Sequence, residues 1–210
     1  MKKHASLFWL GILCLCFWVV DVANVIFVIH KPAWLLWFSS LGLILTAVAL
    51  LTQSALFIFV LFVSHFVLEA IWTIGFFSIL LFNKGIPGIT DYAFTSHFAQ
   101  KDFLITLYHV LIPPSLLWGL LKTRKVYKSG WIWATLLTSL IAAITYIFVE
   151  PHEKVNCIHS VTYCSNAFSD IFNKIQNPNR IFLGLALLTF FVFIPTNFIA
   201  SKMGKALGWK

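Results

Sequence analysis

Runs of about 20 consecutive apolar residues are the feature that most constrains the fold of this chain. At a helical rise of 1.5 Å per residue, such a run matches the ~30 Å hydrocarbon core of a bilayer. A soluble domain could not bury so much apolar surface, because 60% of the residues are hydrophobic and only 10% are charged. We therefore predict an all-α fold, a single transmembrane domain over residues 1–210 in which six helices cross the membrane. They are expected at about 7–29, 33–52, 55–82, 103–121, 131–149 and 181–200.

The basic residues predict how this bundle is oriented. With six crossings, nine Lys and Arg side chains fall on the side of the two termini and six on the other. The first group comprises Lys2, Lys3, Lys122, Arg124, Lys125, Lys128, Lys202, Lys205 and Lys210, and the second Lys31, Lys84, Lys101, Lys154, Lys174 and Arg180. By the positive-inside rule both termini should be cytoplasmic, with external loops at 83–102 and 150–180. The formal charge of +8 then reflects topology, so nucleic acid is not an expected partner.

The first and third segments differ from a simple span. Lys2 and Lys3 precede an apolar run, as in a signal peptide, but cleavage after Ala23 would place Asp21 where a small residue is required. The first segment is therefore expected to remain a helix. The third segment, at about 28 residues, is longer than one span and should tilt or protrude from the bilayer.

Four ionisable residues fall inside the predicted spans, namely Asp21, His65, Glu69 and His109. Such residues are costly in lipid and are functional-site candidates by default. Counted at 1.5 Å per residue, Asp21, Glu69 and His109 all lie about 21 Å from the cytoplasmic boundary. We therefore predict one polar layer in the outer half of the bilayer, with these four residues as catalytic candidates. Asn24, three residues after Asp21, and Tyr146, at a similar depth, are candidates for binding a substrate.

Two prolines follow His109 in the same predicted helix. Proline lacks the amide that would bond the carbonyl four residues earlier, so Pro113 and Pro114 free the carbonyls of His109 and Val110. A kink beside a histidine could open a pocket in which freed backbone groups are tolerated.

The four cysteines and the polar set leave two questions open. An oxidising exterior permits a disulfide between Cys157 and Cys164 in the last external loop, but spacing alone does not decide whether it forms. Asp21, His65, Glu69 and His109 are nitrogen and oxygen ligands of the kind that zinc accepts, without a spacing that demands a metal. The cofactor is therefore unknown.

Four stretches carry a resemblance to a known family: KPAWLLWFSSLGLILTAVALL (31–51), TDYAF (90–94), LYHVLIPPSLLWGL (107–120) and TYIFVEPHEKVN (145–156). They resemble an uncharacterised family of small six-helix bacterial multi-pass membrane proteins. The resemblance implies a bacterial inner-membrane location and no known reaction. The chain departs from the expected pattern at His152, where the family has an acid, and at Cys157, where it has a tryptophan. A fainter similarity, His109 shortly before Pro113, is to the androgen-induced-gene membrane hydrolases, which implies hydrolysis of lipid esters.

Three classes of function remain open at this point. The first is an intramembrane site that acts on or binds a lipid or small hydrophobic substrate, with His109 as general base and Asp21 or Glu69 orienting a histidine. The second is a small proton-coupled transporter or permease, because buried acids and histidines form proton relays. The third is a non-enzymatic accessory subunit. Membrane lipids are the expected partners, together with a second copy of the chain or another membrane protein. Against all three, the polar residues could simply pair and pin helices together.

Overall fold

The computed structural model describes residues 4–84, 90, 100–150, 155–157 and 179–209, without the side chains of 100–106 and 157. Within these residues the fold is all-α, and no strand is present. The long helices are α1 (Ala5–Asn24), α2 (Phe38–Thr52), α3 (Ala55–Phe82), α4 (Gln100–Thr123), α5 (Gly130–Phe148), α7 (Asn179–Leu188) and α8 (Ile194–Ala206). Short helical segments are η1 (Val25–Ile29), η2 (Pro32–Leu36), η5 (Val155–Cys157) and η6 (Thr189–Phe193).

These elements fall on the six predicted segments. The first segment is α1 continued by the π-helical η1, and the sixth is α7, the π-helical η6 and α8 in succession. The second segment differs from its prediction, because it is not one helix. Trp37 has φ −56° and ψ 137°, outside the helical region, and separates the 3-10 turn η2 from α2.

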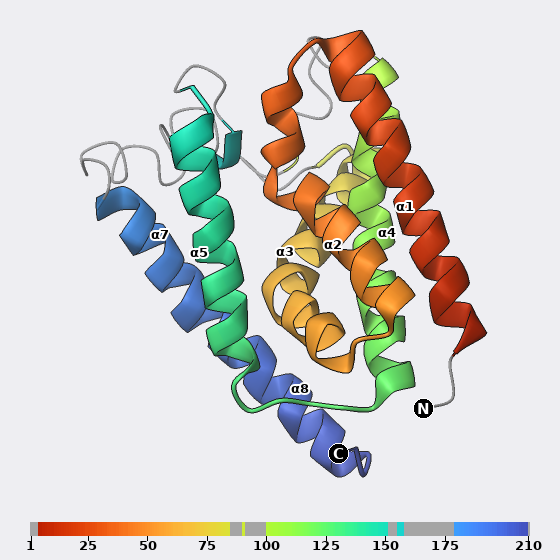
Figure 1. Ribbon diagram of the computed structural model, residues 1–210, viewed down its shortest axis with the longest axis vertical. Coiled ribbons are helices and arrows are strands. Elements are labelled where there is room, and N and C mark those ends of the chain that lie inside the picture. The colour runs from red at the N-terminus through yellow and green to blue at the C-terminus, as the bar shows by residue number, and fades with distance from the viewer. Residues whose placement is uncertain (1–3, 85–89, 91–99, 151–154, 158–178, 210) are drawn as a thin grey trace.

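The helices run up and down in one bundle (Figure 1). The start of α1, the turn between α2 and α3, the link from α4 to α5 and the end of α8 all lie at the lower end of that view. Both chain ends are therefore at the same end of the molecule, which we call the termini end. The predicted external loops lie mostly outside the described residues.

Four helical stretches are long and apolar enough to cross a membrane: Ala5–Ile29, Ala55–Phe82, Gly130–Phe148 and Asn179–Ala206. The helix Phe38–Thr52 is apolar but shorter. Large apolar side chains cover the outside of the bundle, among them Phe27, Ile147, Phe148 and Phe191, each 69% exposed or more. A surface helix of a soluble protein turns a polar face outward, so this distribution is compatible with lipid as the surrounding solvent.

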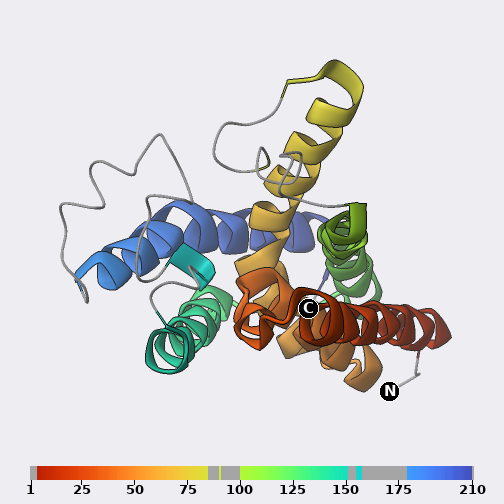
Figure 2. The same ribbon diagram turned by 90° about the horizontal axis from the view of Figure 1, so that it is seen from above.

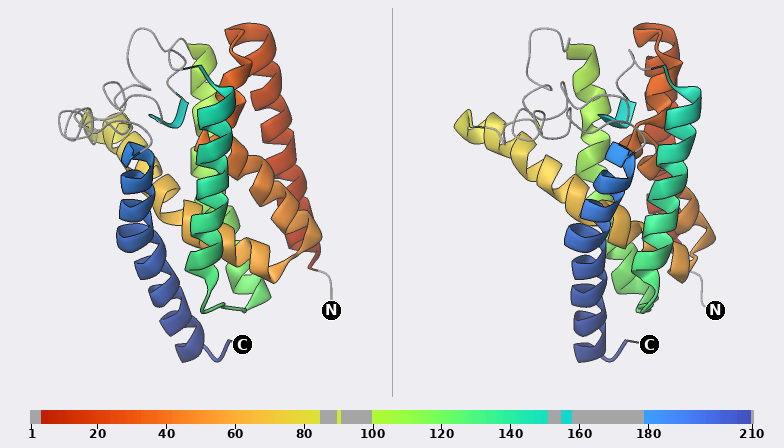
Figure 3. Two further views of the ribbon diagram at one scale, coloured as in Figure 1. Left: turned by 60° about the vertical axis from the view of Figure 1, so that its left-hand side comes forward. Right: turned by 90° about the vertical axis from the view of Figure 1, so that its left-hand side faces the viewer.

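The long third helix runs obliquely to the others. Figure 3 shows α3 crossing the other helices obliquely, and in Figure 2 its C-terminal part projects away from the bundle. Leu80, Leu81 and Phe82 on this projecting part are 53–69% exposed. The N-terminal part of α3 lies inside the bundle, since Ile58 to His65 are all buried. The buried part of α3 is therefore the central element on which the other helices pack.

Helices α1 to α4 form the more closely packed half of the bundle. Gly42 on α2 lies directly against the His65 ring of α3, because a Cβ at this glycine would be 2.4 Å from Cδ2 and 2.7 Å from Nε2. Gly119 on α4 similarly faces Ile58 and Leu50. The missing side chains allow the helix backbones to approach, as is usual for helix contacts in membranes.

The contact at Gly42 leads to the first prediction. Gly42→Ala should lower the free energy of unfolding by about 1–3 kcal/mol, because the added methyl group overlaps a fully buried ring. Thermal unfolding of the detergent-solubilised protein measures this effect. Gly184→Ala on α7 is the matched control, since nothing lies within 4 Å of its Cβ position. Equal melting temperatures for the two variants would contradict the packing described.

Candidate functional site

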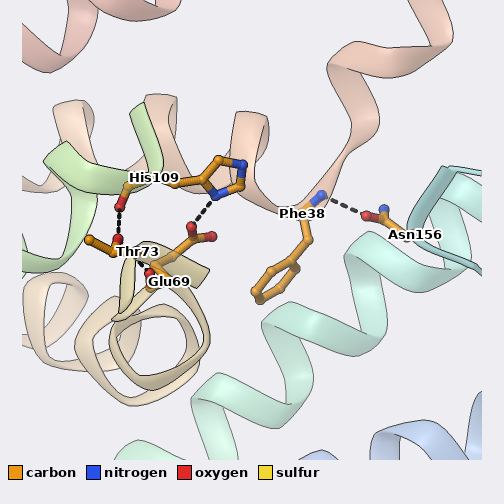
Figure 4. Close-up of polar contacts among 5 residues, drawn as sticks. All are labelled: Phe38, Glu69, Thr73, His109 and Asn156. Atoms are coloured by element: carbon orange, nitrogen blue, oxygen red, sulfur yellow. Dashed lines mark hydrogen bonds and ion pairs between the residues drawn. The ribbon is translucent and has the colours of Figure 1, made fainter. Parts of the chain in front are cut away.

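A carboxylate–imidazole pair joins the two central helices. Glu69 on α3 and His109 on α4 contact each other through Oε2 and Nδ1 at 2.5 Å, and their side chains are only 2% and 8% exposed (Figure 4). A carboxylate accepts, so we assign the Nδ1 proton to the imidazole. The second ring nitrogen, Nε2, points away from Glu69 in Figure 4 and has no hydrogen bond to any described residue. Glu69 therefore fixes Nδ1 of His109, and Nε2 is the ring nitrogen that can exchange a proton with another molecule.

Aromatic rings hold the His109 imidazole in place. Trp72, three residues after Glu69 on α3, stacks on it with ring centroids 4.0 Å apart and an interplanar angle of 19°. Tyr108 lies at 4.5 Å in a tilted arrangement. The spacing of three places Glu69 and Trp72 on one face of α3, so a single helix supplies both the carboxylate and the stacking ring.

The carbonyl freed by Pro113 finds its partner on the same face of α3. Thr73 Oγ1 donates to the His109 carbonyl at 3.0 Å and to the Glu69 carbonyl at 2.7 Å (Figure 4). The proline therefore does not create an unsatisfied group in α4; it creates an acceptor that a neighbouring helix uses. His109 is bound to α3 at two points, its ring through Glu69 and its backbone through Thr73.

Asp21 enters the cluster from α1. Ser40 on α2 donates to Asp21 Oδ2 at 2.5 Å, and Asp21 and Ser40 are 3% and 2% exposed. The neighbouring Ser39 lies close to Glu69, and Asp21 is close enough to His109 for an electrostatic interaction. The structure thus places Asp21 near the Glu69–His109 pair.

The break at Trp37 explains why two serines can reach two carboxylates. It makes Phe38 the first residue of α2, so Ser39 and Ser40 occupy the first turn of a helix. Free amides and the helix dipole favour negative charge at this end. An uninterrupted helix over 33–52 would offer no such end to Asp21 and Glu69.

Asn156 caps this interrupted helix from a distant part of the chain. Its Oδ1 accepts from the Phe38 amide at 2.6 Å (Figure 4), and its Nδ2 donates to the Leu36 carbonyl at 2.7 Å and to Thr145 on α5 at 3.1 Å. Asn156 has a φ of 53°, in the left-handed region that asparagine tolerates better than most residues. One side chain therefore satisfies the backbone on both sides of the Trp37 break and ties it to α5.

His65 lies one turn from Glu69 and is fully buried. Its ring stacks on Phe38 at 4.0 Å and 3°, its Nδ1 is 2.7 Å from Ser64 Oγ, and its Nε2 has no partner among the described residues. It interacts electrostatically with Glu69 but sits under α2, against Gly42. His65 thus supports the α2 turn that presents the serines, while His109 forms the pair itself.

The two predicted binding residues lie differently. Asn24 is half-buried at the end of α1, and its Nδ2 has no partner among the described residues. Tyr146 is 41% exposed, and the residue that α5 turns inward is its fully buried neighbour Thr145. Of the two, Asn24 is the one with an unused buried donor, one turn from Asp21.

The predicted metal ligands do not form a cluster among the described residues, and the predicted disulfide lies outside them. No group of three or more His, Cys, Asp or Glu that could hold a metal ion occurs among the described residues. His109 and Glu69 instead bind each other. Cys164 lies outside the described residues, as does the side chain of Cys157, so the predicted bridge lies outside them too. Cys14 and Cys16 on α1 are free thiols.

Comparison of the chain with protein-family models, with curated proteins and with solved structures gives no match.

The search for ionisable residues in the sequence does not predict several residues of the site, namely Ser39, Ser40, Trp72, Thr73 and Asn156. The sequence does contain a signal for Thr73. This residue lies four positions after Glu69, and a carbonyl freed by Pro113 must find a donor. The serines and Asn156 carry no such signal. Their role depends on the break at Trp37, in a segment whose composition is apolar throughout.

The double hydrogen bond of Thr73 leads to the second prediction. Thr73→Val should lower the free energy of unfolding by about 1 kcal/mol, because an interhelical hydrogen bond is lost and the His109 carbonyl has no replacement donor in its own helix. Unfolding in detergent by denaturant titration measures this loss. Thr123→Val is the matched control, since Thr123 Oγ1 bonds only to carbonyls of its own helix. A smaller loss for Thr73→Val than for Thr123→Val would contradict the role assigned to Thr73.

Proposed function

We propose that this chain is a six-span membrane protein whose Glu69–His109 pair forms an intramembrane acid–base site for a lipid or small hydrophobic substrate. The observation that carries the proposal is the 2.5 Å contact between Glu69 Oε2 and His109 Nδ1, with Nε2 facing away from it (Figure 4). A carboxylate that fixes Nδ1–H orients the ring and stabilises the imidazolium, which is the arrangement a histidine general base requires.

The chemistry follows from this geometry. Nε2 of His109 takes a proton from water or a substrate hydroxyl as its oxygen bonds to an acyl carbon. The imidazolium then returns the proton to the leaving oxygen as the carbon–oxygen bond breaks. Glu69 stays ionised through both steps and balances the charge on the ring. Asp21 and the unused amide of Asn24 are the polar groups available for positioning a headgroup.

The proposed topology has both termini in the cytoplasm of a bacterial inner membrane. It is supported by the excess of Lys and Arg on the termini side and by the common location of both chain ends in Figure 1. In addition to the four long apolar stretches, α2 with η2 and α4 complete six crossings in this proposal.

Reporter fusions test this topology. A C-terminal fluorescent-protein fusion should be bright and a C-terminal alkaline-phosphatase fusion inactive, because phosphatase folds only after export. A phosphatase inserted between residues 150 and 180 should be active. Phosphatase activity at the C-terminus would contradict the orientation.

Complementation in cells lacking the chain tests the acid–base site. The lipid species that accumulates in such cells should be cleared by the natural chain but not by His109→Gln or Glu69→Gln, since loss of a general base costs about 10²–10⁴-fold in rate. Mass spectrometry of lipid extracts measures this. The control is Thr138→Val, which changes a buried polar side chain on α5 without touching the pair. Full clearance by both pair variants, with lowered melting temperatures, would show that the pair is only structural.

Proton-coupled transport is the second candidate, and one observation favours it. Glu69 contacts His109, and Asp21 lies within electrostatic range of the same imidazole, a grouping suited to exchanging a proton between the two carboxylates. Transport predicts a pH-driven flux in liposomes that Glu69→Gln abolishes and no chemical change in the lipids of the deletion cells.

A further inference from the structure

A groove runs between α1 and α4, and neither Glu69 nor His109 lines it. Its volume is about 670 Å³, within the range of small-molecule sites of about 300–1,000 Å³. Its walls are mainly apolar and include Trp9, Leu10 and Leu13 on α1 and Leu111, Pro114 and Trp118 on α4. Trp9, Leu13 and Trp118 are 42–67% exposed, so the described chain leaves this surface uncovered.

The groove occupies a single leaflet. On α1 it extends from Ser6 to Leu13, and on α4 from Trp118 back to Leu111, about 10 Å of helix in each case. This length is about one third of the hydrocarbon core. Because α1 begins and α4 ends at the termini end, the groove lies in the leaflet on that side (Figure 1).

The mouth of the groove carries a positioned cation. Lys122, one turn beyond Trp118, holds its Nζ over the Trp118 ring at 4.4 Å from the centroid. The Trp118 indole in turn donates to Ser6 Oγ at 3.4 Å, which links the two walls at the mouth. An amphipathic tryptophan beside a lysine is the usual arrangement at the level of lipid headgroups.

The charge around this mouth has one sign. Arg124, Lys125 and Lys128 follow Lys122 in the chain, whereas none of the seven acidic residues lies in the segments that form the termini end. A basic surface of this kind attracts anionic lipid.

We propose that this groove is a binding site for one anionic phospholipid, with an acyl chain along α1 and α4 and the phosphate at Lys122. The lipid is a resident ligand of the leaflet at the termini end. The proposal depends on insertion in a membrane but not on any chemistry of His109. Failure of the acid–base test would therefore leave it unaffected, and its own failure would leave the acid–base site unaffected.

Retention of lipid by the purified protein tests the proposal. The full chain is equilibrated with mixed micelles holding equal amounts of phosphatidylglycerol and phosphatidylcholine, and bound lipid is counted by native mass spectrometry. The natural chain should retain phosphatidylglycerol in preference to phosphatidylcholine. Lys122→Gln should reduce this retention several-fold by removing the headgroup contact, and Leu13→Trp should do so by filling the groove from an exposed position.

Two matched variants control for general effects of charge and bulk. Lys202→Gln removes a lysine that also lies over an aromatic ring, Phe198 at 5.3 Å, but Phe198 does not line the groove, whereas Trp118 does. Leu187→Trp adds an indole to a similarly exposed leucine on α7. Both should retain phosphatidylglycerol like the natural chain. Equal loss in Lys122→Gln and Lys202→Gln, undiminished retention in Leu13→Trp, or equal retention of the two lipids would each overturn the proposal.

Discussion

The absence of water is the constraint from which the interior of this protein follows. In a hydrocarbon environment a buried polar group without a partner is costly, and a charged side chain is best paired with a group from another helix. Here the partners come from different helices: Asp21 of α1 with Ser40 of α2, and Glu69 of α3 with His109 of α4. The four N-terminal helices are thereby ordered around one polar cluster. Apolar packing alone would fix their relative rotation less strictly, because apolar faces are interchangeable in lipid.

A second consequence concerns the interrupted helix. An interruption of a helix inside a membrane exposes backbone amides and carbonyls, so it persists only where other groups satisfy them. Asn156 meets this need at Phe38 and Leu36, and it does so from beyond α5. The polar end of α2 thus depends on the C-terminal half of the chain. This dependence joins the two parts of the bundle.

Sequence reasoning predicts the helices better than it predicts the site. Apolar runs of the required length locate α3 at its observed ends, because Ser54 and Asn83 stop an otherwise uniform run. Counting the rise per residue brings Asp21, Glu69 and His109 together, since depth along a helix is nearly independent of packing. The rotation of a helix about its axis does depend on packing, and so Tyr146 faces outward while Thr145 faces the interior. The break at Trp37 has no local signal, because it depends on a hydrogen bond to a residue more than 100 positions later.

The position of Thr73 has a consequence for motion. Glu69 and Thr73 are one turn apart on α3. Glu69 binds the ring of His109, and Thr73 binds its backbone carbonyl. A shift of α4 along α3 would break both contacts together, so the two helices behave as one rigid clamp. The neighbouring hydrogen bond of Ser40 to Asp21 joins α2 to α1 instead. A motion that opens a path to Nε2 of His109 therefore has to keep α3 and α4 in register, or lose both contacts at once.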